Sequence, residues 1–515
     1  MRGRVNDYLR SGIGWAIAII GLLLSGWLRF RMIVFHLNQK RLKRKFGITC
    51  ETPVLSYESQ SLQTPAGKHA RFAETSGSTG EPKRIPYTRL RLFALKLAFS
   101  DMFVRACYAY KIKRTCLYVF TSFETDASLT ALLLDENRLP NYFSTLQAPY
   151  RVQPLPAIRS LVSKYGAAAV RLWILVISNP GVLYSTNPST ISTFLDELVN
   201  DWRRSSKLIR DWCEHGPTFG SDVHRIARRL QSRGSEQRLK QIAMSDLPLP
   251  FSVCAPAVEA YICWTGGYVK PFLDRLAKHL PASRYRLIPM YSMSTETIET
   301  RSYFCGEDVA FFPIAPGVLY EFSDDSETLL NAAQLEPGKH YAMVVSDVYG
   351  LRRYQTDDLF LCRRKVNGLP DLVFVRRRSL AYSFTGEKVT ADHLSAVFEQ
   401  LRKLYPALVA DKFLTCVPSQ PADAIPHYQM LVIGGQRIQS SHKLLAARCD
   451  ELLSEINCEY KSKRASGRLG PVRSMDLGTK EFAEAVTGEG NWETQFKFLP
   501  LTLHPLVSNH VTRVS

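Results

Sequence analysis

The residues best suited to chemistry lie in one short stretch, Glu74–Pro86, which reads ETSGSTGEPKRIP. Its glycines let the backbone approach an anion closely. Its hydroxyl groups can donate hydrogen bonds to phosphate oxygens, and Lys83 adds a positive charge. The spacing does not match a Walker loop, because Gly80 is followed by Glu81 and Pro82 instead of Lys and Ser or Thr. We therefore predict a phosphate cradle, with a solvent-exposed Gly/Ser turn as the alternative. Its predicted ligands are Thr75, Ser76, Gly77, Ser78, Thr79, Gly80 and Lys83.

The nonamer TSGSTGEPK resembles the phosphate-binding loop of the acyl-adenylate-forming superfamily. That superfamily includes acyl-CoA synthetases, the adenylation domains of peptide synthetases and the auxin-responsive acyl acid amido synthetases, also called the Gretchen Hagen family. The chain is most similar to this last branch and its non-plant relatives. Other short segments between about Lys40 and Pro500 resemble the family in the same order, and each implies a role.

Two of these segments are expected beside the nucleotide. The stretch CWTGGYVKPFLDRL is similar to the strand, Gly-Gly turn and helix that lie near the nucleotide in this superfamily. Gly266 and Gly267 are therefore expected beside the nucleotide. An ordinary strand-to-helix turn is the alternative. In YSMSTET the family places an aromatic ring beside adenine, a hydroxyl on a phosphate and a carboxylate on magnesium. These roles fall on Tyr291, Thr295 and Glu296. Carboxylate oxygen is a ligand that Mg²⁺ prefers. A helix-capping Ser/Thr-x-x-Glu pattern is the alternative.

A third segment, VVSDVYGLRRYQTDDLF at Val344–Phe360, is similar to the family stretch that ends in Gly-Asp. Its last aspartate binds the ribose hydroxyls in the family, because one carboxylate can accept two of them. That role falls on Asp358. Where the family has glycine, this chain has Asp357, which is expected to crowd or repel the nucleotide. A plain acidic turn is the alternative.

The last two segments lie toward the C-terminus. Phe374–Lys388 resembles the hinge between the family's large and small domains, which implies that Arg377 or Arg378 contacts ribose or phosphate. A solvated basic patch is the alternative. Residues Gly490–Pro500, GNWETQFKFLP, resemble the C-terminal stretch of the amido synthetases, so Lys497 is the candidate for the acyl phosphate; an ordinary surface lysine is the alternative.

The resemblance implies an ATP-dependent, AMP-forming ligase. ATP and Mg²⁺ are the expected cofactors, with Lys497, Lys83 and Glu296 catalytic and Glu296 on the metal. A carboxylic acid would be activated as acyl-AMP and its acyl group passed to an amine or amino acid. The alternatives are an acyl-CoA ligase that uses the same first step, and a non-catalytic membrane-anchored scaffold or nucleotide sensor. The acid pocket is expected between Leu117 and Ile262.

The composition narrows the partners further. The 515 residues carry a formal net charge of +19, which attracts anions. The basic residues are scattered and do not form a stripe interleaved with aromatics, so no nucleic-acid partner is expected. The eleven cysteines include no C-x-x-C pair, which argues against a zinc site or a disulfide framework. Free thiols suit a reducing compartment.

An apolar run near the N-terminus, Gly12–Leu28, just reaches the length needed to span a bilayer. Basic residues follow it at positions 40–45, so the catalytic body is predicted to face the cytoplasm. We therefore predict a membrane-anchored protein with one transmembrane helix. The alternatives are a helix packed on the rest of the protein or lying flat on the membrane.

The rest of the chain reads as an α/β protein of two domains. Short β-rich runs, such as Thr115–Phe123, Arg286–Met293 and Tyr341–Val348, alternate with helical patterns, which favours a layered domain. The predicted parts are an anchoring helix (1–37), a large adenylate-forming domain (38–378) and a small mobile α+β domain (379–515). Amphipathic helices are expected at Ser192–Ala243, and the small domain is predicted to contain a helix at Ala391–Leu404, a strand at Tyr428–Ile433 and a helix at Ser441–Glu455.

Overall fold

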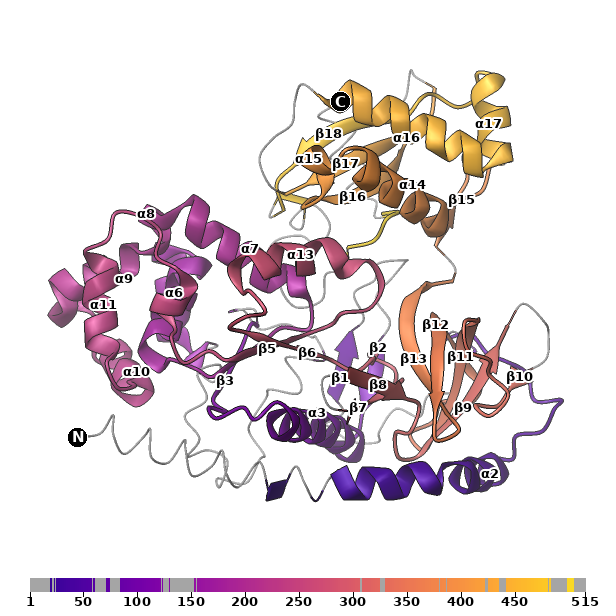
Figure 1. Cartoon of the computed structure of the whole chain (residues 1–515), viewed down its shortest axis with the longest axis horizontal. Coiled ribbons are helices and arrows are strands. Elements are labelled where there is room, and N and C mark those ends of the chain that lie inside the picture. Colours follow the sequence, from indigo (N-terminus) through magenta and orange to yellow (C-terminus); the bar gives the residue numbers. More distant parts are fainter. Residues whose placement is uncertain are drawn as a thin grey trace. The chain divides into compact units, whose positions relative to one another are not determined.

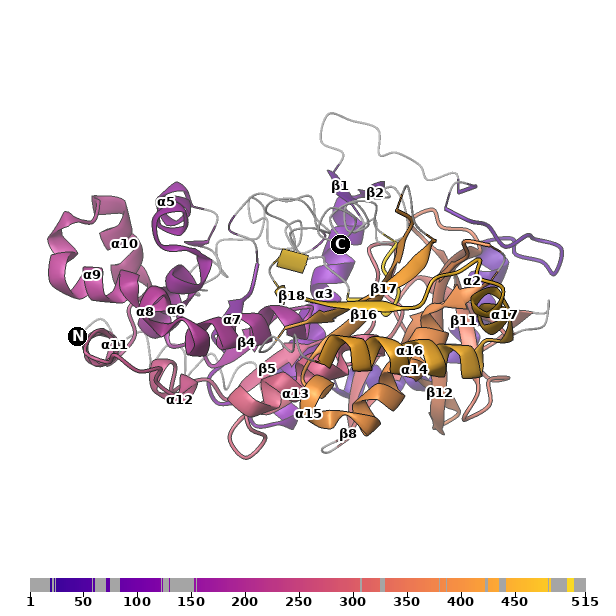
Figure 2. The same ribbon diagram turned by 90° about the horizontal axis from the view of Figure 1, so that it is seen from above.

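The computed structural model covers most of the chain (Figures 1 and 2). It describes residues 19, 20, 23, 25–57, 59–60, 71–74, 84–121, 123, 129, 152–153, 155–305, 308–324, 329–378, 380–385, 387–421, 425–434, 441–479, 481–482 and 498–503. These residues form two compact units. Unit 1 comprises the described residues within 1–74, 84–266 and 276–376, and unit 2 comprises those within 267–275 and 377–515.

A four-stranded parallel sheet lies at the centre of unit 1, in the order β3-β4-β5-β6. Its strands are Leu117–Val119, Val182–Tyr184, Ala260–Cys263 and Arg286–Pro289. β4 and β5 are buried along their whole length, as expected for parallel strands covered on both faces. The α/β layering predicted from the sequence is confirmed.

Helices connect these strands and extend beyond them. The helix α6 reads AAAVRLWILVIS and is almost wholly buried, so its apolar run Leu172–Ile177 belongs to the core. The amphipathic helices expected between Ser192 and Ala243 are present as α7 to α11. The helices of this part are α3 (Arg89–Ala109), α5 (Pro156–Tyr165), α6 (Ala167–Ser178), α7 (Pro188–Asn200), α8 (Trp202–Ser205), α9 (Lys207–His215), α10 (Ser221–Leu230), α11 (Ser235–Ala243) and α12 (Phe251–Cys254), with the 3₁₀ turn Gly216–Thr218. The 3₁₀ turn Gly267–Val269 and residues 270–275 of α13 (Lys270–His279) belong to unit 2, and the rest of α13 belongs to unit 1.

Unit 1 also contains an antiparallel sheet in the order β10-β9-β11-β12-β13. Its strands are β9 (Val318–Ser323), β10 (Leu329–Leu330), β11 (His340–Asp347), β12 (Tyr354–Val366) and β13 (Leu369–Arg377). Asn367 and Gly368 join β12 to β13 with positive φ angles of 50° and 80°, as a tight Asn-Gly hairpin turn requires. Two further antiparallel pairs are β1 (Arg71–Glu74) with β2 (Arg84–Tyr87), and β7 (Arg301–Cys305) with β8 (Asp308–Phe312).

The N-terminal segment packs on unit 1. Residues 25–33 are helical and α2 covers Phe35–Lys45. Leu28, Met32 and Phe35 are at most 6% exposed and join the core of the unit. Gln39 pairs with the backbone of β9, donating to the Val318 carbonyl and accepting from the Tyr320 amide, both at 2.9 Å. Figure 1 shows α2 alongside this strand.

The prediction of a transmembrane helix is wrong for the described part of the chain. None of its described helices combines the length and the apolar character that crossing a bilayer requires. One face of the segment packs in the protein core, which was the alternative considered from the sequence. The predicted membrane partner and membrane-anchored, cytoplasm-facing localisation are corrected with it.

Unit 2 is a small α+β fold. β16 (Phe413–Ser419) pairs antiparallel with β17 (His427–Ile433), which pairs parallel with β18 (Arg473–Leu477). The helices α14 (Ala391–Leu404) and α16 (His442–Ile456) lie side by side against this sheet (Figure 2). The remaining elements are β14 (Ala381–Tyr382), β15 (Val389–Thr390), α15 (Pro406–Val409) and α17 (Cys458–Ala465). The predicted mobility of this unit stays a prediction.

Packing of the N-terminal helix predicts a difference between its two faces. Leu28→Ala should lower the free energy of unfolding by about 2–5 kcal/mol, because Leu28 is 1% exposed and its removal leaves a cavity. Ile33→Ala is the matched control on the same helix, 79% exposed, and should change it by about 0.5 kcal/mol or less. Urea unfolding followed by tryptophan fluorescence measures both. Equal effects would contradict the packed helix.

Candidate functional site

The predicted phosphate loop connects the two strands of a hairpin. The residues Thr75–Lys83 lie outside the described part of the chain, so their roles stay predictions. The strands that flank them are described, and Glu74 pairs directly with Arg84. At the end of β2, the Tyr87 hydroxyl donates a hydrogen bond to the Thr295 carbonyl. The base of the loop is therefore joined to the segment in which the sequence placed the adenine and magnesium ligands.

That second segment follows β6, at the carboxyl end of a parallel strand, where ligands of α/β proteins commonly bind. Tyr291 is 1% exposed, and burial raises the pKa of its hydroxyl above the ordinary value. Thr295 is half-buried. Glu296 is 2% exposed, and its Oε1 accepts a hydrogen bond of 3.0 Å from the hydroxyl of Tyr354 on β12. A buried carboxylate is thus held at the end of the central sheet.

The ribose candidate Asp358 lies in a β-bulge. On β11 the pairing moves by two residues, from Ala342 to Val344, while on β12 it moves by four, from Leu359 to Gln355. Bulges of this kind redirect side chains near functional sites. Asp358 is 3% exposed, and its amide donates to Thr356 Oγ1 at 3.2 Å. The bulge therefore fixes the backbone beside the predicted ribose ligand.

Asp357 occupies the position at which the sequence comparison expected glycine. Its φ angle is +59°, in the left-handed region that glycine favours and that aspartate tolerates better than most residues. Its carboxylate accepts a hydrogen bond of 3.0 Å from Gln355 Nε2. The backbone conformation expected of glycine is therefore retained, and the side chain has a neighbour on its own strand.

Arg91 joins three segments that are remote in sequence. It lies in the first turn of α3, which Thr88 caps by accepting the Arg91 amide at 3.2 Å. The guanidinium, buried with the side chain 4% exposed, donates to the Pro86 carbonyl at 3.2 Å and to the Glu296 carbonyl. It also lies 3.8 Å from a carboxylate oxygen of Asp347.

Asp347 in turn orders the chain before β12. Its Oδ1 accepts the amides of Tyr349 and Leu351 at 2.8 and 3.0 Å. Burial raises the pKa of the Asp347 carboxyl above its ordinary value, and the nearby charge of Arg91 opposes this rise. One ion pair thus connects the hairpin base, the Glu296 segment and the approach to Asp358.

Gly266, the first glycine of the Gly-Gly turn, packs against the antiparallel sheet of unit 1. A Cβ added to Gly266 would lie 3.0 Å from the Phe374 carbonyl oxygen, so a side chain there is disfavoured. The rings of Trp264 and Phe374 are 4.9 Å apart, and Phe374 contacts Phe360 of β12 at 5.8 Å. Gly267 has a φ angle of +70°. The turn therefore needs glycine at both positions.

Two predicted residues remain, Arg378 and Lys497. Arg378 is exposed, and Lys497 lies outside the described residues. Neither is placed relative to unit 1, so their roles stay predictions.

Sequence reasoning missed four residues that organise the site, namely Arg91, Asp347, Tyr87 and Tyr354. Asp347 and Tyr354 lie inside the segment VVSDVYGLRRYQTDDLF, where only the terminal acidic pair was considered. Tyr87 and Arg91 follow the phosphate loop within eight residues of Lys83. The signal available in the sequence was that these residues lie close to recognised motifs. No local pattern shows which distant groups they contact.

Comparison with known proteins bears on this arrangement. Residues 309–377, which contain β9 to β13, Asp347 and Asp358, match the GH3 family central domain. The chain carries a GH3 domain. The resemblance inferred from the sequence is thereby confirmed.

The chain is also similar to curated proteins of plants. The chain is 26% identical over 202 residues to indole-3-acetic acid-amido synthetase GH3.8 of Oryza sativa subsp. indica. The aligned region covers 37% of this chain and 33% of that protein. It is 27% identical over 353 residues to jasmonoyl–L-amino acid synthetase GH3.5 of Oryza sativa subsp. japonica, covering 62% and 60%. The chain thus spans between a third and three-fifths of the length of these curated relatives.

A solved structure extends the likeness to the fold. The GH3.15 acyl acid amido synthetase superposes with a TM-score of 0.65 at 16% identity, over 90% of this chain and 87% of that chain. At this identity the comparison shows a common fold, which is the mixed α/β fold of both proteins.

The bulge in the GH3 domain predicts which residues position 357 accepts. Asp357→Gly should keep nucleotide affinity within a few-fold, because glycine adopts a positive φ without strain. Asp357→Val should destabilise the chain by about 1–2 kcal/mol and weaken nucleotide binding, because a branched side chain disfavours that conformation. Asn367→Val is the matched control, since Asn367 has a φ of +50° in the β12–β13 turn. It should destabilise similarly without weakening nucleotide binding in a titration with a fluorescent ATP analogue.

The Arg91–Asp347 pair predicts a pH-dependent defect. Arg91→Met should destabilise the chain by about 3–5 kcal/mol, because it leaves the buried Asp347 carboxylate without its cation. Loss of Arg91 removes the interaction that lowers the pKa of Asp347, so this folded-state pKa rises further. The variant should then lose stability as the pH rises through this folded-state pKa of Asp347. The destabilisation caused by Arg91→Met should therefore be larger at neutral than at acidic pH.

The double variant Arg91→Met/Asp347→Asn is the control for this effect. Without the carboxylate, the extra loss of stability on going from acidic to neutral pH should disappear. Urea unfolding at several pH values measures it. A defect of Arg91→Met that is independent of pH would contradict the assigned ion pair.

Proposed function

We propose that this protein activates a carboxylic acid with ATP as its acyl-AMP and transfers the acyl group to an amine or amino acid. The observation that carries the proposal is the hydrogen bond between Tyr354 and Glu296. Tyr354 precedes Asp358 by four residues on β12, so the candidate ribose and magnesium ligands belong to one buried framework. The names of the relatives, amido synthetases for indole-3-acetic acid and for jasmonoyl–amino acid conjugation, support the reaction class.

ATP is proposed to lie along this framework. The loop Thr75–Gly80 would donate hydrogen bonds to the phosphates, and Lys83 would offset their charge. Asp358 would accept the ribose hydroxyls, and Gly266 with Gly267 would allow the chain to approach the nucleotide without a side chain in between. Tyr291 is assigned to adenine and Thr295 to a phosphate, on the family resemblance. Arg378 from unit 2 would contact ribose or phosphate.

Magnesium would be held by Glu296. The described residues contain no group of three or more His, Cys, Asp or Glu side chains that could cage a metal ion. This suits Mg²⁺, which usually takes one or two carboxylates together with water and substrate phosphates. Glu296 fits because it is a buried carboxylate whose Oε1 is oriented by the Tyr354 hydroxyl. When bound, the ion would neutralise phosphate charge.

The chemistry is dominated by electrostatics. A carboxylate must attack the α-phosphate of ATP, so two anions have to approach each other. Lys83 and the loop hydroxyls would hold the triphosphate in place, and Lys497 would stabilise the charge on the α-phosphate. The carboxylate oxygen forms the new bond to phosphorus while pyrophosphate leaves. The acyl-AMP would then react with an amine, which releases AMP and leaves an amide.

ATP–pyrophosphate exchange over a panel of carboxylic acids tests the first step. The wild-type chain should catalyse exchange that depends on an acid, and Lys83→Ala should lower its rate by roughly 10²-fold or more, because a positioned charge in the transition state is lost. Glu296→Gln should raise the magnesium concentration needed for half-maximal exchange. Lys339→Ala is the control, an exposed lysine paired with Glu336, and should leave the rate unchanged.

The outcome also separates the rival functions. ATP binding without exchange for any acid would overturn the proposal and favour a nucleotide-binding scaffold. With an acid that supports exchange, mass spectrometry of products formed with amino acids or with CoA identifies the acceptor. An amide is expected, and a CoA thioester alone would assign the acyl-CoA ligase alternative.

A further inference from the structure

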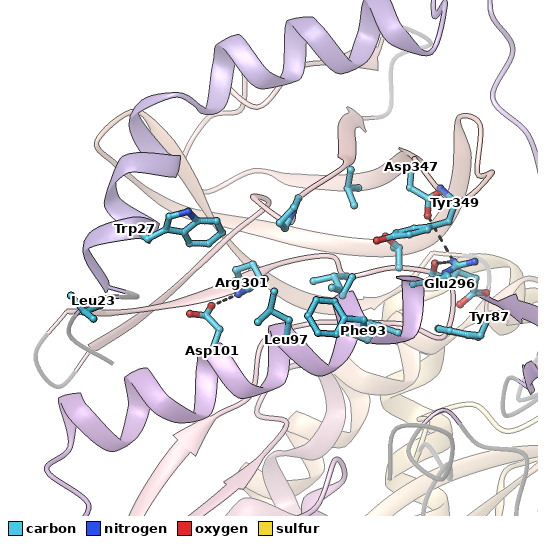
Figure 3. A pocket seen from close by; sticks show the side chains of 17 residues that line it. Leu23, Trp27, Tyr87, Phe93, Leu97, Asp101, Glu296, Arg301, Asp347 and Tyr349 are labelled. Atoms are coloured by element: carbon cyan, nitrogen blue, oxygen red, sulfur yellow. Dashed lines mark hydrogen bonds and ion pairs between the residues drawn. The ribbon is translucent and has the colours of Figure 1, made fainter. Parts of the chain in front are cut away.

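A cavity of about 570 Å³ lies between α3 and the N-terminal helix, within unit 1. Figure 3 shows Leu23 and Trp27 at one end, with Leu97 and Phe93 of α3 along the middle. Tyr87, Glu296 and Tyr349 lie at the other end (Figure 3). The volume is in the range of sites that hold drug-sized molecules.

The cavity is separated by α3 from the region in which the acid is expected. Phe93, Leu97 and Asp101 recur every four residues, so they lie along one side of the helix. Phe99 projects elsewhere on the helix, with its ring 4.9 Å from that of Tyr184 in the parallel sheet. The cavity therefore borders the side of α3 that faces the N-terminal helix.

Several large apolar side chains of its lining are exposed. Leu23 is 69% exposed, Phe93 59%, Leu97 47% and Trp27 43%. Large apolar side chains gathered around one hollow favour an apolar occupant, because its binding would remove their surfaces from water. The two walls come from segments some 70 residues apart in the chain, so the hollow exists only because the N-terminal helix packs on unit 1.

Most charges at its border are paired within the protein, and the carboxylate of Glu296 accepts a hydrogen bond from Tyr354. Asp101 accepts two hydrogen bonds from Arg105, at 2.9 and 2.8 Å, and is also paired with Arg301. Arg91 is engaged by Asp347 and by backbone carbonyls. A charged ligand would have to compete with these buried pairs, which is costly. The border therefore favours an uncharged ligand.

Two polar groups at the border have no hydrogen-bond partner among the described residues, the Thr297 hydroxyl and Arg301 Nε. The Thr297 hydroxyl is buried, with the residue 6% exposed, and makes no hydrogen bond there. A rotation about its χ1 would let it serve a ligand head group, since a hydroxyl both donates and accepts. A neutral head group such as a hydroxyl would satisfy it.

We propose that this cavity binds a neutral, mainly apolar small molecule with one hydrogen-bonding head group, of the class of medium-chain alcohols. Its body lies between Trp27 and Leu97, and its head group meets Thr297. At one end the site borders Glu296, the proposed magnesium ligand, and its apolar body lies on the other side of α3 from the region in which the acid is expected. Binding there does not depend on the proposed ligase activity.

Displacement of a fluorescent probe tests the ligand class. The full-length chain is titrated with the neutral dye N-phenyl-1-naphthylamine, and 1-decanol, decanoate or decylammonium is added as competitor. Saturable dye binding is expected, with 1-decanol displacing the dye at concentrations about tenfold lower than either charged compound. Stronger displacement by decanoate or by decylammonium would overturn the assignment.

Two variants locate the site. Leu97→Trp should fill the cavity and weaken dye and decanol binding about tenfold or more. Ile33→Trp is the control, because Ile33 is 79% exposed, lies on the N-terminal helix that forms the other wall, and does not border the cavity. It should leave binding unchanged. Equal affinities in the two variants would show non-specific adsorption and overturn the proposal.

A measurement on the unaltered cavity guards against misfolding of the filled variant. The quencher 10-bromodecanol should reduce the tryptophan emission of the wild-type chain more than that of Trp27→Phe, since Trp27 lines the site. The difference should disappear when 1-decanol is present in excess. Equal quenching of the two proteins would overturn the proposal whatever the state of Leu97→Trp.

Discussion

The buried guanidinium of Arg91 is the interaction on which the candidate site depends. It bonds to the carbonyls of Pro86 and Glu296 and pairs with Asp347, so it links positions separated by more than 200 residues. Buried charges and carbonyls without partners are strongly destabilising. The three segments therefore stabilise one another only in this arrangement. Tyr87 and Tyr349 lie beside the same guanidinium, 5.0 and 5.6 Å from ring centroid to Cζ, and shield it from water.

The GH3 domain adds a second constraint, which is local strain. The bulge in β12 and the positive φ of Asp357 hold the backbone in conformations that a regular strand would not adopt. Such strain persists where the surrounding structure fixes it, and it concentrates at functional sites. Here Thr356 anchors the bulge by donating to the Met343 carbonyl at 2.9 Å. Asp357 retains the backbone that the position requires, and the crowding or repulsion of the nucleotide expected from its side chain stays a prediction.

The N-terminal segment shows why an apolar run is ambiguous. Hydropathy depends on composition, and the same residues satisfy a bilayer or a protein core. Leu28, Met32 and Phe35 pack into unit 1, whereas Trp27 borders the cavity beside α3. For the described residues, the two hydrogen bonds of Gln39 with the backbone of β9 favour packing on the protein over insertion into a bilayer. These bonds form only where the segment lies against β9.

The sequence by itself determined the elements whose causes are local. The helix expected at Ala391–Leu404 has those bounds in α14, and the strand expected at Tyr428–Ile433 is β17. Periodicity and capping act within a few residues, so they can be read along the chain. The fold class and the GH3 resemblance followed in the same way, from short motifs in a fixed order.

Only the tertiary structure decided which distant groups meet. The partners of Arg91, the hydrogen bond from Tyr354 to Glu296 and the packing of the N-terminal helix all join residues far apart in sequence. No local pattern encodes such pairs, because each depends on the simultaneous burial of several segments. The candidate ligands could therefore be named from the sequence, whereas the framework that positions Glu296 and Asp358 could not.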